Sequence, residues 1–96
     1  MNEEKEVRAA RIGQKFAIEL EAMPGAGYMW ELTGQAESLE LVSQKVVSIS
    51  KGIGGNSTQR FVFIARLAGD YALVFQLKRK WEKEPVKINK FSIQVK

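Results

Sequence analysis

The 96-residue chain contains no cysteine and no histidine. Without cysteine there is no disulfide framework, no thiolate nucleophile and no zinc site built on cysteine. Without histidine the commonest general base is missing, together with the catalytic triads that need it and the usual zinc ligand. An enzyme made from this chain would have to rely on carboxylates, lysine or tyrosine. The composition therefore favours a binding protein over an enzyme, and we expect neither a metal nor another cofactor.

Long hydrophobic runs are also missing. No stretch is long and apolar enough to cross a membrane, and the first fifteen residues are charged and lack the apolar segment of a signal peptide. A membrane partner is therefore not expected, and a signal removed before this sequence begins would leave no trace in it. A chain without cysteine is compatible with either redox environment, so the compartment stays open.

Charge is present but unevenly distributed along the chain, whose net charge is +4. Residues 1–40 carry four basic and eight acidic side chains, whereas residues 41–96 carry eleven basic and three acidic ones. Such asymmetry can indicate binding to nucleic acid or to an acidic partner. The simpler interpretation is a solvated sheet face with alternating lysines, and we assign Lys83, Lys87 and Lys90 to such a face.

Apolar residues alternate with polar ones over most of the chain, which is typical of half-buried strands, while helical periodicity is weak. Residues 1–6 are mostly charged and are predicted to be frayed. The expected strands span residues 7–10, 15–22, 28–33, 39–50, 61–67, 71–77 and 86–95. About seven strands in one domain of residues 1–96 predict an all-β fold, an antiparallel β-sandwich. A small barrel of the OB type is the rival architecture.

Two details favour an immunoglobulin-like sandwich. Trp30 lies on the third expected strand, where such sandwiches bury a tryptophan. Tyr71 follows the segment Leu67–Asp70 in the manner of a tyrosine corner, in which the phenol bonds to upstream backbone. We therefore assign Trp30 to the core.

Three connections have unusual compositions: a first loop (Met23–Tyr28), a second loop (Lys51–Asn56) and a third loop (Lys78–Trp81). They follow the second, fourth and sixth expected strands, so all three are predicted at the same end of the sandwich. Proline and glycine stiffen and sharpen the first loop, and the third loop carries an exposed indole beside an arginine, as interface hot spots do. The candidate binding residues are Met23, Pro24, Gly25, Ala26, Gly27, Tyr28, Gly52, Ile53, Gly54, Gly55, Arg79, Lys80 and Trp81. A phosphate-binding role for Gly52–Gly55 is disfavoured, because no Gly-Lys-Ser/Thr signature or helix start follows.

These loops resemble those of the chagasin family of cysteine-protease inhibitors, which are immunoglobulin-like domains. That family has an Asn-Pro-Thr-Thr-Gly-Tyr/Phe loop, a Gly-x-Gly-Gly loop and an Arg-Pro-Trp/Phe loop, in this order. This chain departs from the pattern at Met23 in place of asparagine, at Gly25-Ala26 in place of the threonine pair, and at Lys80 in place of proline. The Gly-x-Gly-Gly motif is intact. The resemblance covers nearly the whole chain, from the strand before the first loop to the last strand.

The resemblance implies a reversible, occlusive inhibitor of papain-like cysteine proteases. The first loop would lie at the catalytic centre and the other two on either side of the cleft, with the chain acting as a monomer and without nucleic acid. Secretion or export to a periplasm is implied if a signal was removed, and a cytoplasmic location otherwise. The alternatives left open are a single-stranded nucleic-acid-binding domain of OB type and a non-inhibitory immunoglobulin-like interaction module.

Overall fold

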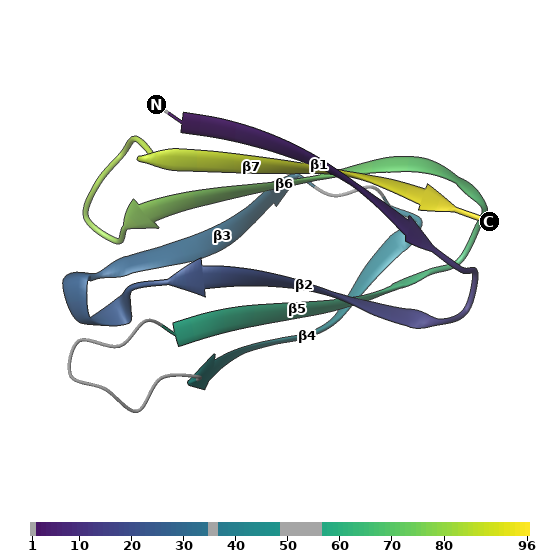
Figure 1. The fold of residues 1–96 in the computed structure, drawn as a ribbon, viewed down its shortest axis with the longest axis horizontal. Coiled ribbons are helices and arrows are strands. Elements are labelled where there is room, and N and C mark those ends of the chain that lie inside the picture. The colour runs from purple at the N-terminus through teal and green to yellow at the C-terminus, as the bar shows by residue number, and fades with distance from the viewer. Residues whose placement is uncertain (1, 35–36, 49–56) are drawn as a thin grey trace.

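The structure, a computed structural model, describes residues 2–34, 37–48 and 57–96. Seven strands form two sheets packed face to face (Figure 1). A four-stranded sheet has the order β1-β7-β6-β3 and a three-stranded sheet the order β2-β5-β4. The strands are β1 (Asn2–Ala10), β2 (Lys15–Ala22), β3 (Tyr28–Gly34), β4 (Leu39–Ser48), β5 (Ser57–Ala65), β6 (Gly69–Arg79) and β7 (Lys87–Val95). The predicted seven-stranded sandwich is confirmed, and two separate sheets rule out the barrel of OB type.

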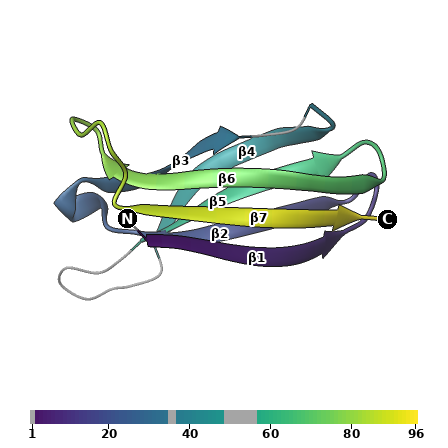
Figure 2. The same ribbon diagram turned by 90° about the horizontal axis from the view of Figure 1, so that it is seen from above.

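The N-terminal strand differs from the prediction. Residues 2–6 are not frayed: all of β1 pairs with β7, from Asn2 opposite Lys87 to Ala10 opposite Val95. This pairing is parallel, whereas the other strand pairs of the described residues are antiparallel. The charged sequence of β1 gave no sign of this, because its backbone partners lie at the other end of the chain. Figure 2 shows β1 beside β7 at the edge of the four-stranded sheet.

Charged side chains protect the edge that β1 forms. Glu6 and Arg8 form an ion pair, and the Arg8 guanidinium lies over the ring of Phe91, 5.7 Å from its centroid. Phe91 is a core residue, so these charges point toward the interior side of an edge strand. Inward-pointing charges of this kind discourage another strand from adding to a free sheet edge.

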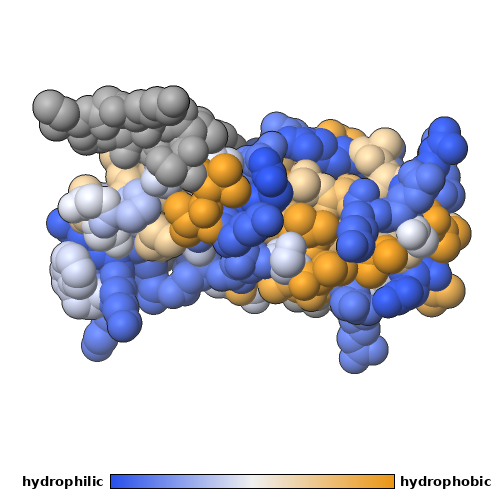
Figure 3. Space-filling model, turned by 90° about the horizontal axis from the view of Figure 1, so that it is seen from below, coloured by the Kyte–Doolittle hydropathy of each residue, from blue (hydrophilic) through white to orange (hydrophobic). Residues whose placement is uncertain are grey.

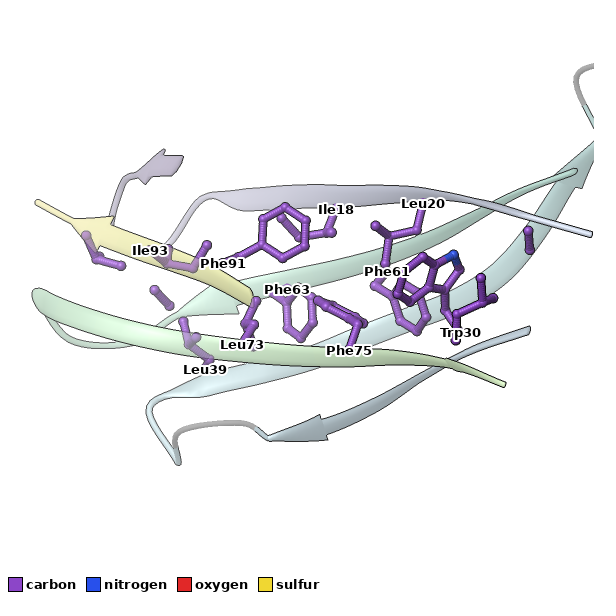
Figure 4. Packing of buried hydrophobic residues seen from close by; sticks show 14 residues of the cluster. Ile18, Leu20, Trp30, Leu39, Phe61, Phe63, Leu73, Phe75, Phe91 and Ile93 are labelled. Carbon is purple, nitrogen blue, oxygen red and sulfur yellow. The ribbon is translucent and has the colours of Figure 1, made fainter. Parts of the chain in front are cut away.

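The core lies between the sheets and follows the predicted alternation (Figure 4). Each of β2, β5, β6 and β7 contributes every second residue, and the largest fully buried side chains are Phe61, Phe63, Phe75, Ile18, Leu39, Leu73 and Ile93. Burying a side chain of this size contributes about 1.5–3 kcal/mol. Leu67 does not continue the alternation of β5 as the sequence predicts, and its side chain is 62% exposed. The reason is that β5 ends at Ala65, so Leu67 lies in the turn before β6.

Trp30 is confirmed as a core residue, with 4% of its surface exposed. Its indole Nε1–H donates to the carbonyl of Glu21 at 2.8 Å, and its backbone N–H donates to Gln59 Oε1 at 2.7 Å. The Gln59 amide donates in turn to the Trp30 carbonyl at 3.2 Å. Gln59 is the one buried polar residue among those described, and it joins the two sheets where β5 faces β3. Gln59 is not among the core residues predicted from the sequence.

The tyrosine corner is also confirmed. The Tyr71 hydroxyl donates to the carbonyls of Leu67 and Ala68, at 3.0 Å and 3.3 Å. These bonds hold the turn between β5 and β6, at the end of the sandwich away from the first loop (Figure 1). On the outer face of the three-stranded sheet, apolar side chains gather toward this same far end (Figure 3).

The strand pairing places the predicted loops at the opposite end. Ser57, the first residue of β5, pairs with both Ala22 and Ser48, so β2, β4 and β5 terminate together. Tyr28 pairs with Arg79, so β3 begins where β6 ends. The first and third loops therefore lie at one end, as predicted, and the anchoring strands of the second loop terminate there too. Within the described residues, no helix is long and apolar enough to cross a membrane.

Candidate functional site

The first loop is a closed turn held by its own backbone. Pro24–Ala26 form a short 3-10 helix, η1, with Pro24 fixing its entry. The carbonyl of Met23 accepts hydrogen bonds from Ala26 N–H and from Tyr28 N–H, both at 3.0 Å, and Met23 N–H donates to the Tyr28 carbonyl at 3.2 Å. Backbone bonds in both directions thus close the loop at its base, and its shape does not depend on a polar side chain.

Gly27 ends this turn in a conformation that favours glycine. Its φ is +87°, in the left-handed region, and its N–H donates to the Pro24 carbonyl at 2.9 Å. A Cβ at this position would lie 3.0 Å from Cη2 of Trp81 and 3.4 Å from Cγ of Arg79. The first loop is therefore in contact with the third loop at Gly27. Gly25 has no positive φ, and a Cβ there would meet nothing within 4 Å.

The third loop starts at the end of β6 and turns sharply. Glu82 N–H donates to the Arg79 carbonyl at 2.9 Å, and Val86 N–H donates to the Leu77 carbonyl at 2.8 Å, which closes the connection to β7. Trp81 is 73% exposed, as the sequence predicted for an indole among charged residues. An exposed tryptophan beside an arginine is the residue combination found in interface hot spots.

Arg79 links the two loops through aromatic rings. Its guanidinium lies 4.8 Å from the ring centroid of Tyr28 and 5.7 Å from that of Trp81, within the range of cation–π attraction. The contact with Tyr28 follows from the strand register, because the two residues are direct cross-strand neighbours. One cation thus contacts a ring from each loop.

Glu82 orients this cation. Arg79 Nε donates to Glu82 Oε1 at 3.0 Å and Arg79 Nη2 donates to Oε2 at 3.3 Å, a two-pronged ion pair. The hydrogen bond from Arg79 lowers the pKa of the Glu82 carboxyl, and the same bond raises the pKa of the guanidinium. Glu82 is not among the residues predicted from the sequence, although its position three residues after Arg79 was a signal for such an ion pair.

The predicted site residues fall into three groups. The six residues of the first loop and the pair Arg79 and Trp81 are brought together, as the sequence predicted. Lys80 lies between that pair with its side chain exposed. Gly52, Ile53, Gly54 and Gly55 lie outside the described residues.

The residues brought together at this end are suited to binding through shape, aromatic stacking and charge rather than to catalysing a reaction. Among the described residues, no group of three or more acidic side chains is placed to hold a metal ion. The surface of this end includes a hydrogen-bonded backbone turn, an exposed indole and the exposed Lys80 side chain. Such a set can bind a protein surface but offers no nucleophile paired with a base.

A comparison with family models matches residues 9–95 to the chagasin family peptidase inhibitor I42. Three solved structures share the fold at low sequence identity. The cysteine protease inhibitor EhICP2 from Entamoeba histolytica has a TM-score of 0.81 and 17% identity, covering 99% of this chain and 95% of that one. PbICP-C, solved in complex with falcipain-2, has a TM-score of 0.75 and 19% identity, with coverages of 99% and 90%. Amebosin has a TM-score of 0.72 and 17% identity, with coverages of 97% and 98%. No curated protein sequence matches the chain.

Proposed function

This chain belongs to the chagasin family of peptidase inhibitors, so it is an inhibitor of papain-like cysteine proteases and not an enzyme; we propose that it blocks the active-site cleft with the loop end of the sandwich. The loop end is defined here as the first loop together with Arg79, Lys80 and Trp81. The observation that carries the proposal is the contact of the first and third loops, with the indole of Trp81 exposed beside Gly27. PbICP-C, which was solved in complex with falcipain-2, has the same fold.

The first loop suits the position nearest the catalytic thiolate. Gly25 and Ala26 carry almost no side chain, so a protease can approach their backbone closely. The hydrogen bonds around Met23 keep η1 in a tight turn, whereas a protease cleaves a peptide that can align its carbonyl with the nucleophile. A turn fixed in this way occupies the site without becoming a substrate. Because it is already ordered, little conformational entropy is lost on binding.

The departures from the family pattern are compatible with this mechanism. Where the family has asparagine, the side chain could bond nearby backbone to hold the turn. Here the backbone N–H and carbonyl of Met23 close the loop, so that side-chain role is not needed. The missing threonine hydroxyls at Gly25-Ala26 shift the expected source of affinity away from the first loop and toward Trp81.

We assign Gly52, Ile53, Gly54 and Gly55 to the same binding surface by their resemblance to the family motif and by the strands that anchor them. Their flanking residues Ser48 and Ser57 are direct cross-strand partners at the same end of the sandwich, where Ser57 also pairs with Ala22, the residue before the first loop. We also propose that one monomer blocks one protease, because the loop end is a single continuous surface of one chain.

The nucleic-acid alternative finds no support in the display of aromatic rings. A single-stranded nucleic-acid binder stacks bases on rings exposed on a sheet face. Here Phe61, Phe63 and Phe75 have no exposed surface and belong to the core. No observation favours the alternative of a non-inhibitory immunoglobulin-like module. A purely structural domain would not need an exposed indole in contact with a glycine turn.

Paired substitutions at the two ends of the sandwich test the proposal. The exposed Trp81 at the loop end is replaced by alanine, and the exposed Leu67 at the far end serves as the matched control. An indole can bury on the order of 200 Å² in an interface, and truncating such an anchor costs about 2 kcal/mol or more. We expect Trp81→Ala to raise the inhibition constant for papain roughly thirtyfold and Leu67→Ala to leave it unchanged.

The fold is expected to survive both substitutions, because neither side chain is buried, and melting temperatures check this. If Trp81→Ala inhibits papain as well as the unmodified chain does, the loop end is not the binding surface. If the unmodified chain inhibits no papain-like protease at micromolar concentration, the inhibitor function itself is wrong.

A further inference from the structure

One cation joins the first and third loops in addition to the contact at Gly27. The Arg79 guanidinium lies over the rings of both Tyr28 and Trp81, which come from different loops, and its Cγ and Cδ atoms pack beside Gly27. A guanidinium on a flexible stem has several rotamers, and only a narrow set reaches both rings. A further group must therefore select the orientation that joins the loops.

We propose that Glu82 is a positioning residue that holds the Arg79 guanidinium over the rings of Tyr28 and Trp81, so that the first and third loops form one preformed surface. The consequence for inhibition rests on the proposed function. The positioning itself does not, because it concerns contacts within the free chain.

Three contacts place Glu82 in this role. Its two carboxylate oxygens accept from Nε and Nη2 of Arg79, and its Oε1 also lies 3.3 Å from the Arg79 backbone N–H. A carboxylate that takes two prongs of a guanidinium fixes the plane of the group as well as its distance. The turn bond from Glu82 N–H to the Arg79 carbonyl fixes the spacing of the two backbones.

Stability is not the expected benefit of this ion pair. The Arg79 and Glu82 side chains are 37% and 30% exposed, and ion pairs at such positions contribute little to folding. The ion pair is expected instead to keep the Trp81 side chain ordered, because that side chain is 73% exposed and little else holds it in place. Lys80 lacks the fixed φ of the proline that the resembled motif has at this position. The Arg79–Glu82 pair supplies the rigidity that a proline would give.

Preforming the loops strengthens binding because their side chains need not be ordered when the complex forms. Each exposed side chain released from its position weakens binding about threefold to tenfold. Gly27 completes the arrangement, because a Cβ at that position would lie only 3.0 Å from Cη2 of Trp81.

The first experiment compares Glu82→Gln with Glu84→Gln by acrylamide quenching of tryptophan fluorescence. Glu84 lies on the same connection, is exposed and forms no ion pair in the part of the chain that the structure describes. Both variants change the net charge equally. Trp30 is buried, so a change in quenching reports mainly on Trp81. We expect Glu82→Gln alone to increase the quenching constant and to raise the papain inhibition constant about threefold to tenfold, with melting temperature nearly unchanged.

The second experiment repeats Glu82→Gln in an Arg79→Met background, with melting temperatures confirming the fold. A residue that acts through Arg79 has no further effect once the guanidinium is gone, so we expect the inhibition constant to stay at the Arg79→Met value. An equal loss in both backgrounds would show that Glu82 contacts the protease itself and would overturn the positioning role. Identical quenching by Glu82→Gln and Glu84→Gln would also overturn it. If the unmodified chain inhibits no protease, the proposed function fails, and the quenching comparison alone decides the role of Glu82.

Discussion

Replacing Gly27 by alanine is expected to destabilise the protein and weaken inhibition together. Gly27 has a φ of +87° and caps η1 through its bond to the Pro24 carbonyl. An L-residue in the left-handed region costs about 1–2 kcal/mol. The added methyl group would also lie 3.0 Å from Cη2 of Trp81, a tight contact that shifts the exposed indole from its position beside the turn by a few tenths of an ångström.

The magnitude can be converted into a melting temperature. For a domain of this size, 1 kcal/mol shifts the midpoint by about 4–8 °C, so Gly27→Ala should lower it by roughly 5–15 °C. Displacement of Trp81 should also raise the papain inhibition constant about tenfold, because part of the anchor energy of a hot-spot indole is lost. Thermal unfolding followed by circular dichroism and steady-state inhibition kinetics measure the two effects separately.

Gly25→Ala is the matched control for stability. It is two residues away in the same loop, has no positive φ, and has open space where its Cβ would be. Alanine at a compatible glycine position stabilises by about 0.4–1 kcal/mol through the unfolded chain, so its midpoint should stay equal or rise. If Gly27→Ala melts and inhibits like the unmodified protein, neither the left-handed cap nor the contact with Trp81 has the importance assigned to it.

Three further predictions concern the scaffold and the ion pair. Tyr71→Phe removes the hydrogen bond to the Leu67 carbonyl, so we expect the unfolding free energy to fall by about 1 kcal/mol and the melting temperature by about 4–8 °C. The inhibition constant should stay unchanged, because Tyr71 is far from the loop end. Gln59→Leu leaves the buried N–H and C=O of Trp30 without their partner and should cost about 2 kcal/mol or more, measured by urea unfolding; an unaltered midpoint would refute the sheet-joining role. The pKa of Glu82 is lowered in the folded chain by its hydrogen bond from Arg79, a group charged throughout this range, so the pair persists at a pH that protonates an ordinary glutamate and is lost only once the pH falls through that lowered value. Acrylamide quenching should therefore increase below that pH in the unmodified chain and stay constant in Glu82→Gln.

Much of the core could be predicted from the sequence because alternation reports burial directly. Phe61 and Phe63, or Leu73 and Phe75, could face inward only if the intervening residues faced out, and the structure agrees. The first strand could not be predicted in this way. Its residues 2–6 are nearly all charged, and what orders them is backbone pairing with β7, which leaves no periodic signal in the local sequence.

The loop end was predictable in outline and not in detail. Counting strands places alternate connections at one end, which brought the first and third loops together. The cation–π contact between Arg79 and Tyr28 depends instead on the exact register of β3 and β6, and no local pattern specifies a register between strands so far apart in sequence. Either Gly25 or Gly27 could have adopted positive φ, and only the backbone bonds of the closed turn select Gly27.

The most direct test of the proposed mechanism is a titration of papain with the unmodified chain at neutral pH, followed through hydrolysis of a fluorogenic peptide at several substrate concentrations. Blocking of the cleft by preformed loops predicts competitive inhibition, full loss of activity at one chain per active site, and an inhibitor that stays uncut after long incubation. Undiminished hydrolysis with the chain in large excess, or cleavage of the chain within Met23–Tyr28, would contradict it.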